Sequence, residues 1–304
     1  MDTLSQILDD IRLRGGEFRD LQLYAPWAFR LETPGLASFH IVTQGSCWLL
    51  REGAEPLRLD AGDLVVLPGG AAHRVQDSPE TPGEAAPDLS AELGSPRREP
   101  HRLGTAGPLA RLLSGRFSFE VELARPLVGA LPPLLLHRGQ GAGPPVWLRI
   151  GLQFLADERS QNRPAQQAVI NRLADILLIQ VLRNHISELP EGSGNWLLAL
   201  RDRALSAALS AMHREPQRPW TVPELAEIAS LSRSAFAERF NQVLGQPPLA
   251  YLTEHRMRLA AWQLRHGSQP VCRIAEQVGY NSETAFSQAF KRSHGVSPSG
   301  YRKT

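Results

Sequence analysis

The sequence predicts an α+β protein with two domains. The first is a small N-terminal β-barrel with flanking helices, and the second is an all-α domain in which a long helix joins two helix-turn-helix units. Short runs that alternate apolar and polar residues fill residues 24–75, which is the pattern of successive antiparallel strands. From residue 147 onward, apolar residues recur at intervals of three and four, as on amphipathic helices. Two similar helical segments near the C-terminus are offset by 50 residues, which indicates an internal repeat.

Composition sets the outer limits of the protein class. The 304 residues suffice for two domains, each with its own core. No run of about 18 uncharged apolar residues occurs, so we expect no membrane span and no membrane partner. The opening residues, MDTLSQILDDIRLRGGEF, are typical of an amphipathic helix rather than of a signal peptide. Cys47 and Cys272 lie 225 positions apart and provide neither a disulfide framework nor a thiolate zinc site, so we expect a cytoplasmic, reduced protein.

Charge is distributed unevenly along the chain, although the formal net charge is only +2. From Asn195 to the end, 14 Lys and Arg stand against 8 Asp and Glu, whereas the first 194 residues hold 19 against 23. A basic C-terminal third beside an acidic remainder is typical of a polyanion-binding module attached to a domain with another role. A net charge of +6 over 110 residues is also compatible with solubility alone.

The first domain is predicted at residues 1–187. Strand-like runs occupy 24–75 and resume at 116–123 and 131–139, after a polar, Pro- and Gly-rich loop at 76–107. Helical spacing follows at 147–160 and 163–189. The second of these helices carries a broad apolar stripe that either packs within its own domain or forms a dimer seam: Val169, Leu173, Ile176, Leu177, Val181 and Leu182. We assign ELPEGSGN, residues 188–195, to a linker.

The second domain is predicted at residues 196–304 and contains the repeat. In the first unit, Thr221 and Glu224 have capping-box spacing, and Ser232 is predicted to cap the next helix. Ser282 has the equivalent position in the second unit. The phenylalanine pairs of the two units, Phe236 with Phe240 and Phe286 with Phe290, mark the inward stripes. Between the units, one continuous helix is expected to turn these residues inward: Leu249, Leu252, Met257, Ala260, Ala261 and Leu264.

The C-terminal third also resembles a known family. The strings YLTEHRMRLAAWQL and RIAEQVGYNSETAFSQAFKRSHGVSPSGYR are similar to those of the AraC/XylS transcription regulators, and the resemblance covers about residues 200–303. It implies two helix-turn-helix units bridged by a long helix, and sequence-specific binding of double-stranded DNA. Recognition helices held about 34 Å apart would enter successive major grooves on one face of the DNA.

Polar residues at the start of each recognition helix are the candidates for base contacts. Gln can pair with adenine, Arg with guanine and Glu with a cytosine amine, and Ser or Thr can serve either role. These candidates are Arg233, Ser234, Ala237, Glu238, Glu283, Thr284, Ser287 and Gln288. Glu238 and Glu283 could instead stabilise the helix dipole. The candidates for phosphate contacts are Arg239, Arg256, Lys291, Arg292 and Arg302, of which Arg239 and Arg256 could instead form ion pairs within the domain.

The stretch GDLVVLPGGAAH, residues 62–73, resembles the second motif of the cupin family. Gly62, Pro68, Gly70 and His73 carry the resemblance, which implies a β-barrel in which His73 could hold a metal. The remaining ligands of a cupin metal site, two histidines and a glutamate, should lie on an earlier strand. Counting back from Gly45, those positions hold Glu32, Pro34 and Ser38, so the ligand set is incomplete.

The predicted effector pocket contains the inward-facing residues that remain in the barrel: Ser38, His40, Cys47 and His73. His40, His73 and Cys47 could in principle bind zinc, but we expect a pocket without a metal or other cofactor. A thiol at Cys47 could respond to oxidants, although a single cysteine on a strand is most often a small buried residue.

Three functional hypotheses follow. The favoured one is a homodimeric transcription regulator, not an enzyme, in which the barrel senses a small molecule or redox signal and the C-terminal helices bind DNA. Residues 20–80 support it, because they resemble the cupin-type domains that precede AraC-type DNA-binding domains. The alternatives are a metal-dependent cupin enzyme with a helical appendage and a constitutive DNA-binding protein with an inert barrel.

Overall fold

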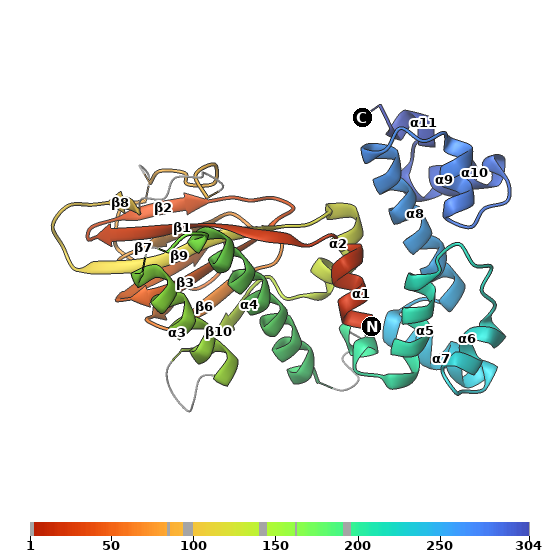
Figure 1. The fold of residues 1–304 in the computed structure, drawn as a ribbon, viewed down its shortest axis with the longest axis horizontal. Helices are drawn as coiled ribbons and strands as arrows, with labels where there is room; N and C mark the ends of the chain where they lie inside the picture. The colour runs from red at the N-terminus through yellow and green to blue at the C-terminus, as the bar shows by residue number, and fades with distance from the viewer. Residues whose placement is uncertain are drawn as a thin grey trace. The chain divides into compact units, whose positions relative to one another are not determined.

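The computed structural model describes residues 3–83, 86–93, 100–139, 145–161, 163–190 and 196–303. The chain divides into two compact units (Figure 1). The barrel unit comprises Arg14–Phe119 and Leu131–His185, and the helical unit comprises Met1–Leu13, Glu120–Ala130 and Ile186–Thr304. Residues 1–13 and 120–130 therefore group with the C-terminal helices, whereas the sequence pattern placed them in the first domain. Residues 191–195 of the expected linker lie outside the described residues.

The barrel unit is built from two β-sheets. One has six strands in the order β10-β6-β3-β9-β1-β8, and the other has four in the order β2-β7-β4-β5. β1 and β8 pair in parallel, and the other strand pairs are antiparallel. The strands are β1 (Arg14–Tyr24), β2 (Ala28–Leu31), β3 (Ala37–Gln44), β4 (Ser46–Arg51), β5 (Leu57–Asp60), β6 (Leu64–Leu67), β7 (His73–Gln76), β8 (His101–Leu103), β9 (Leu109–Ser118) and β10 (Leu135–His137).

Alternate residues of both sheets face a shared apolar interior. Phe29 on β2, Val42 on β3, Leu49 on β4 and Val75 on β7 belong to one buried cluster. Because side chains alternate between the faces of a strand, each strand places every second residue in this interior. The short alternating runs of residues 24–75 are thus confirmed as strands.

Two helices, α3 (Val146–Ser160) and α4 (Gln166–Glu188), complete the barrel unit. Most of the predicted stripe on α4 is buried, including Leu173, Leu177, Val181 and Leu182. A β-carbon added at Gly151 of α3 would lie 2.7 Å from the Leu177 side chain, so the two helices pack closely there. These residues of the stripe therefore pack within their own unit, whereas Ile176 of the same stripe is 53% exposed.

The sequence pattern misplaced two elements. Residues 116–123 were predicted as one strand, but β9 ends at Ser118 and the helix α2 (Val121–Ala130) begins almost at once. The buried residues of α2 are Leu123, Ala124 and Leu127. The sequence FEVEL (residues 119–123) alternates apolar and polar residues as a strand does, and the helical spacing of the apolar residues begins only after it. Strand β1 was likewise unrecognised, because its first residues were read as the end of an N-terminal helix, whereas α1 spans only Thr3–Asp10.

The helical unit is organised around the long helix α8 (Pro248–His266). One apolar cluster joins the start of α8 to the helices before it, and a second joins the rest of α8 to the helices after it. The other elements are η1 (Trp196–Leu200), α5 (Arg203–Arg214), α6 (Val222–Ile228), α7 (Arg233–Leu244), α9 (Val271–Gln277), α10 (Glu283–His294) and α11 (Pro298–Tyr301). Because each cluster has its own buried phenylalanines, each helix pair has a core of its own.

The predicted repeat is present in the two helix pairs. Thr221 and Glu224 form the expected capping box at the start of α6. Ser232 and Ser282 cap α7 and α10 by accepting from the backbone amides of Ala235 and Ala285. The prediction that Leu249 of α8 faces inward was wrong, since 41% of its surface is exposed. The buried face of α8 begins at Pro248 and continues through Tyr251 and Leu252, and Leu249 lies outside that face. Across the described residues, no helix has the length and hydropathy that crossing a bilayer requires.

Candidate DNA interface and barrel site

Two buried phenylalanines orient each candidate recognition helix. Phe236 and Phe240 of α7, and Phe286 and Phe290 of α10, are fully buried. In each helix the two rings are one turn apart, with ring centroids 5.5 Å apart in α7 and 5.8 Å in α10. Because one stripe of each helix is fixed in the core, the opposite stripe faces solvent. The spacing of the phenylalanines therefore determines which side chains of α7 and α10 are exposed to a binding partner.

The outward residues include the predicted base contacts. Six are exposed and two, Ala237 and Ser287, are half-buried; the exposed ones are Arg233, Ser234, Glu238, Glu283, Thr284 and Gln288. The helix-dipole alternative fits only Glu283, which is the first residue of α10. Glu238 lies beyond the first turn of α7 and accepts a hydrogen bond from Gln242 at 3.5 Å.

Three of the five phosphate candidates have partners within the helical unit. Arg239 pairs with Asp202, the N-cap residue of α5, at 2.5 Å. Arg256 donates to the backbone carbonyls of Pro216 and Arg218 at 2.6 and 2.8 Å, and Arg302 donates to that of Gln269. These contacts give the three arginines a role in holding loops against helices.

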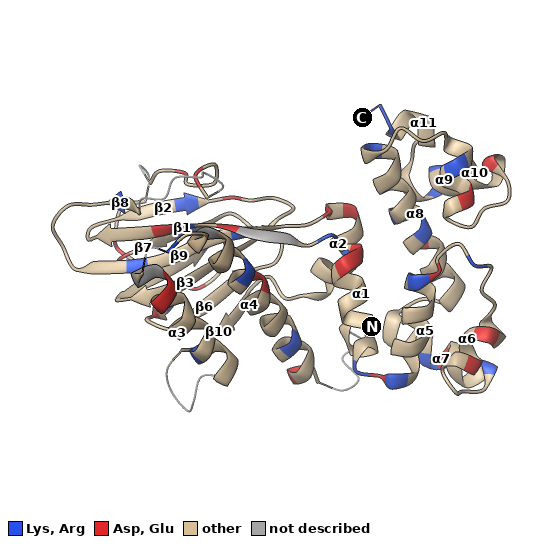
Figure 2. Ribbon diagram, in the orientation of Figure 1, with Lys and Arg blue, Asp and Glu red and all other residues tan. Residues whose placement is uncertain are grey.

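Lys291 and Arg292 lie exposed in the last turn of α10. Figure 2 shows acidic residues close to basic ones along the helices of this unit, so charge alone does not mark one face. A position on the outward stripe of α10 is a better guide to phosphate contact than charge alone. It favours Lys291 and Arg292 over the three arginines that already have partners within the unit.

The repeat also indicates two residues that sequence reasoning missed. Subtracting the offset of 50 from Lys291 and Arg292 gives Asn241 and Gln242 on α7, and both are exposed. Asn and Gln can pair with adenine through both polar atoms of the amide. The signal for these residues is the repeat itself, because they lie beyond the first two turns of α7, which hold the predicted base contacts.

In the barrel, a row of polar side chains crosses the apolar interior. Nε2 of His40 lies 2.8 Å from Nε2 of His73, and Nδ1 of His40 lies 2.7 Å from the hydroxyl of Ser114. Nδ1 of His73 lies 2.7 Å from the carbonyl oxygen of Ala71 and donates to it. His40 and Ser114 are directly paired across β3 and β9. The sequence predicted the two histidines but not Ser114, because the partner strand lies 74 residues away.

Burial lowers the pKa of both histidines. Desolvation is the main cause for each, and the second histidine adds to it at His40, whose pKa lies well below the usual value. Both imidazoles are therefore neutral at neutral pH. Only one proton can lie between the two Nε2 atoms, so one histidine donates and the other accepts.

Because His40 and His73 are neutral in the folded protein, the barrel unit is expected to lose stability in acid. An unfolded histidine takes up a proton near pH 6.5, whereas the folded pair resists it. The stabilisation is therefore complete above that pH and decreases as pH falls below it, by about 1 kcal/mol at pH 5.5 from His40, with a further loss from His73. Urea unfolding at pH 7.5 and 5.5 would measure this. Replacing both histidines with Gln should flatten the pH dependence, and an unchanged pH dependence in that variant would contradict the assignment.

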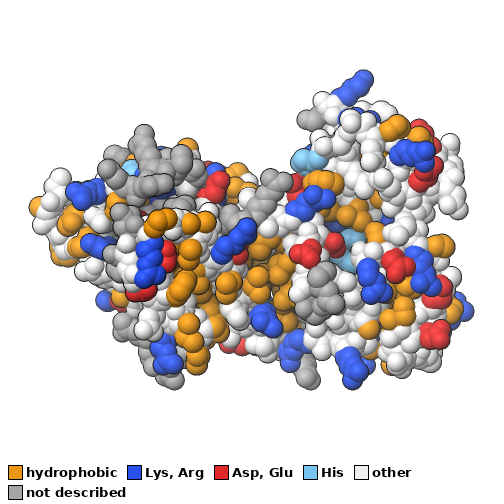
Figure 3. All heavy atoms as spheres, viewed as in Figure 1, with side chains coloured by type: hydrophobic (Ala, Val, Ile, Leu, Met, Phe, Trp, Pro, Cys, Tyr) orange, Lys and Arg blue, Asp and Glu red, His pale blue; other side chains and the backbone are white. Residues whose placement is uncertain are grey.

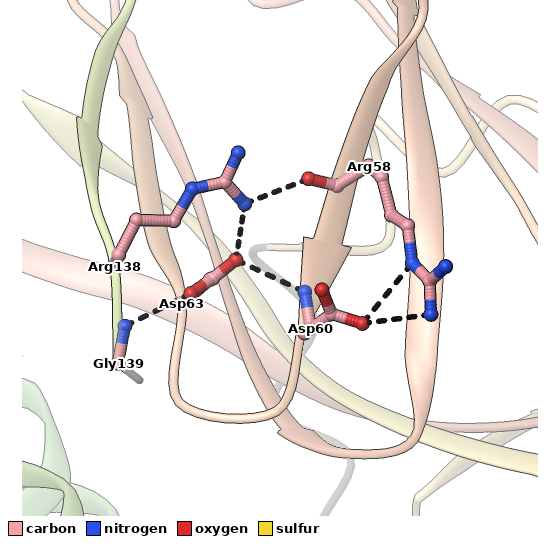
Figure 4. Close-up of polar contacts among 5 residues, drawn as sticks. All are labelled: Arg58, Asp60, Asp63, Arg138 and Gly139. Carbon is pink, nitrogen blue, oxygen red and sulfur yellow. Dashed lines mark hydrogen bonds and ion pairs between the residues drawn. The ribbon is translucent and has the colours of Figure 1, made fainter. Parts of the chain in front are cut away.

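The first half of the cupin-like motif has a structural role. Asp63 is almost fully buried. It accepts hydrogen bonds from the backbone amides of Asp60 and Gly139 at 3.0 and 2.9 Å and pairs with Arg138 at 2.6 Å (Figure 4). Arg138 also donates to the carbonyl of Arg58 at 2.8 Å. Asp63 thus ties the turn before β6 to the segment that follows β10.

The four predicted effector-pocket residues are all buried, and His73 is the one of them with exposed surface. Ser38, His40 and Cys47 have no exposed surface, and Ser38 Oγ has no hydrogen-bond partner in the described part of the chain. His73 borders a surface pocket of about 470 Å³ whose walls also carry Arg30, Arg51, Arg74, Glu32, Glu52 and Asp88. His73 is therefore the residue of the four that a ligand could reach from this pocket.

The environment of Cys47 disfavours the ionised form of its thiol. Burial, together with Asp60 and Asp63, raises the pKa of its thiol far above the usual range, so the reactive thiolate is disfavoured. Within the described residues, the group of three potential metal ligands that converges is Asp10, His213 and His255, not a group with Cys47. His40 and His73 thus meet without a third ligand from Cys47.

Family comparisons agree with both halves of the architecture. The chain matches the family described as Cupin over residues 2–187 and the family described as Helix-turn-helix domain over residues 225–304. It is 36% identical to the HTH-type transcriptional regulator AlkR of Acinetobacter baylyi, over 100% of this chain and 99% of that protein. It is 34% identical to a putative AraC-like transcription regulator of Streptomyces lividans, over 100% and 98%.

Among solved structures, the C-terminal domain of AraT from Geobacillus stearothermophilus is 34% identical, with a TM-score of 0.31, over 33% of this chain and 83% of that one. The named full-length relatives are transcriptional regulators, so the alternative of a metal-dependent cupin enzyme is set aside. The chain belongs to the AraC-type family of helix-turn-helix transcriptional regulators, with a cupin domain preceding the DNA-binding helices.

Proposed function

We propose that α6–α7 and α9–α10 are two helix-turn-helix units, and that α7 and α10 read bases in successive major grooves. The observation that carries this proposal is the equivalence of the two pairs about α8. Each has a serine-capped second helix, two buried phenylalanines and an outward polar stripe. Side chains near the N-terminus of a recognition helix are those that contact base edges. The chemistry of Arg233, Thr284 and Gln288 suits that role.

Fluorescence anisotropy with DNA from upstream of the protein's own gene tests this proposal. Specific binding should survive an excess of unrelated DNA and should exceed the salt-sensitive background. Gln288→Ala is expected to cost about 1–3 kcal/mol on the specific site and little on unrelated DNA. Gln277→Ala, an exposed glutamine at the end of α9, is the matched control. Equal losses on both DNAs would remove Gln288 from the base-reading set.

We further propose that a small molecule controls DNA binding through the barrel unit, and that it binds in the pocket bordered by His73. A ligand there would contact His73, the end of the His73–His40–Ser114 row that borders the pocket. Displacing His73 would leave Nε2 of His40 without its partner, and an unpaired buried polar atom is costly. Ligand binding and the arrangement of the barrel interior are thereby coupled.

A compound screen scored by DNA anisotropy tests the effector site. His73→Asn should keep the DNA affinity of the free protein and lose the response to any active compound. A response that persists in His73→Asn would place the effector elsewhere. DNA affinity that no compound changes would favour the constitutive regulator with an inert barrel.

We propose that the protein is a homodimer formed through α3. Val146, Ile150 and Phe154 follow one another at four-residue intervals and are 60%, 58% and 48% exposed, and Ile176 on α4 is 53% exposed. Figure 3 shows hydrophobic side chains gathered over these two helices. Exposed apolar patches of this kind mark interaction sites. The same stripe on a second copy is self-complementary about a twofold axis, which makes a second copy the favoured occupant.

Ile150→Glu is expected to shift the protein from dimer to monomer, with at least about a tenfold rise in the dimer dissociation constant. Two carboxylates would be buried against an apolar surface, at a cost of several kcal/mol. Sedimentation velocity over a concentration series measures this. Val121→Glu, at an exposed valine of α2, should leave the oligomeric state unchanged. A wild-type protein that stays monomeric at every concentration would remove the proposal.

A further inference from the structure

We infer that Asp10, His213 and His255 form a binding site for a single divalent transition-metal ion of the zinc class. One carboxylate oxygen and one nitrogen from each imidazole lie within 4.8 Å of one another. The three residues come from α1, α5 and α8, which all belong to the helical unit. Two histidines and a carboxylate, with a fourth position left for water, are a familiar zinc ligand set.

The hydrogen bonds of His213 suit it to metal binding. Its Nδ1 lies 2.5 Å from a carboxylate oxygen of Asp10, and its Nε2 lies 2.8 Å from the hydroxyl of Tyr251. A metal ion at Nδ1 would replace the proton shared with Asp10. Nε2–H would then donate to Tyr251, and such an outer partner fixes the tautomer and orientation of a ligating histidine.

His255 provides an independent sign of a missing partner. It is 3% exposed, and its Nε2 has no hydrogen-bond partner among the described residues. Its ring centroid lies 4.1 Å from that of His213. Burial also lowers the pKa of His255 well below the usual value, so the imidazole is neutral, the form in which histidine binds metals. A buried imidazole nitrogen without a partner is costly, and a metal ion would satisfy it.

The surroundings allow one more small ligand. A cavity of about 20 Å³ borders all three residues and is lined also by Ile11, Leu127 and Trp196. About 10–15 Å³ is enough for one water molecule, so the fourth tetrahedral position could hold a water. Arg258 also borders the cavity and would oppose a cation. Its guanidinium, however, lies 3.6 Å from Glu254, which offsets part of that charge.

A metal at this position would hold the N-terminal helix against the DNA-binding helices. Ideal tetrahedral zinc ligands lie about 3.3 Å apart, so small side-chain rotations would close the cluster. Helix α8 joins both helix pairs, and α1 is already linked to α5 by the hydrogen bonds of Thr3 with Ser206. The metal would therefore add a second clamp between α1 and these helices. This inference does not depend on the proposed effector or dimer.

Titration of the full-length, tag-free protein with Zn²⁺ by calorimetry, and with Co²⁺ by visible absorption, tests the site. We expect one equivalent to bind and the Co²⁺ spectrum to show tetrahedral coordination. Asp10→Asn and His255→Gln should each weaken binding by more than the 10–100-fold that loss of an outer-shell partner costs. Zinc should also raise the thermal unfolding midpoint of the wild type by about 5 °C at a hundredfold excess over Kd, and should not do so in either variant.

Two variants test whether zinc binds at other side chains instead. His266→Gln removes a half-exposed histidine elsewhere on α8, and Cys272→Ser removes an exposed thiol that could bind zinc. Both variants should bind zinc as the wild type does. Asp10→Asn preserves the shape of a partly exposed side chain, and its thermal unfolding transition without zinc shows whether the variant is folded. Zinc binding that survives in Asp10→Asn and His255→Gln, that disappears in Cys272→Ser, or that is absent from the wild type would overturn the inference.

Discussion

Replacing Lys291 and Arg292 together with alanine is expected to weaken binding to specific and unrelated DNA alike, by about 100-fold or more at low salt. Each charged contact to a phosphate contributes about 1.5–3 kcal/mol, and every 1.4 kcal/mol changes affinity tenfold. The two side chains lie exposed at the end of α10, where phosphates would border the groove if α10 binds as proposed. Because each phosphate contact releases counterions, the slope of log K against log salt should fall by about 2.

Anisotropy titrations at several salt concentrations measure both effects. Arg172→Ala combined with Arg214→Ala removes the same formal charge from exposed positions outside α10, and it should change affinity much less. If the two double variants lost affinity equally, net charge rather than the position of Lys291 and Arg292 would be responsible. A loss confined to the specific site would instead make these residues base readers.

Gly70→Ala is expected to destabilise the barrel unit by about 4 kcal/mol or more, which is the range of disruptive core substitutions. Gly70 has a φ of +62°, a region that costs other residues about 1–2 kcal/mol. A β-carbon there would also lie 2.0 Å from the carbonyl oxygen of Thr33 and 2.3 Å from that of Leu36. These backbone atoms cannot move aside without displacing the loop before β3. The hydrogen bond from the Thr33 amide to the Gly70 carbonyl, 3.1 Å long, would be lost as well.

Urea unfolding of the barrel unit measures this cost, with Gly53→Ala as the matched control. Gly53 has nearly the same φ, +67°, but no atom lies within 4 Å of the position its β-carbon would take. Its substitution should therefore cost only the backbone term of about 1–2 kcal/mol. Equal losses in the two variants would show that the clash at Gly70 is relieved without strain. The cupin-like glycine would then be required for its dihedral angle alone.

The two helix pairs and the long helix α8 between them could be predicted from the sequence, because their signals are local. Capping residues such as Ser232 and Ser282 act within one turn, and the spacing of Phe286 and Phe290 defines a buried face without knowledge of the partner helix. The outward faces of α7 and α10 follow directly. The prediction for Leu249 was wrong because the buried face of α8 passes through Pro248, Tyr251 and Leu252, which leaves Leu249 on its flank.

The barrel depended on information that lies far apart in the chain. His40 and His73 were identified by their inward positions, but their pairing, and the presence of Ser114 between strands, required the register of β3 with β9. Cys47 shares the inward face with the histidines and still lies away from them. Alternation gives the face of a strand, whereas distances within a barrel depend on which strands are neighbours.

The family, the two-part architecture, the outward faces of α7 and α10 and the incomplete cupin ligand set could be predicted from the sequence, because each depends on residues close together in the chain. The packed structure was needed to show which arginines are engaged with the backbone, which stripe of α3 stays exposed, and how α1 and α2 join the helical unit. It alone brought Asp10 to His213 and His255, across 203 residues for the first pair. The physical reason is that capping and periodicity are local, whereas hydrogen bonding and burial between distant segments depend on the packing of the whole chain.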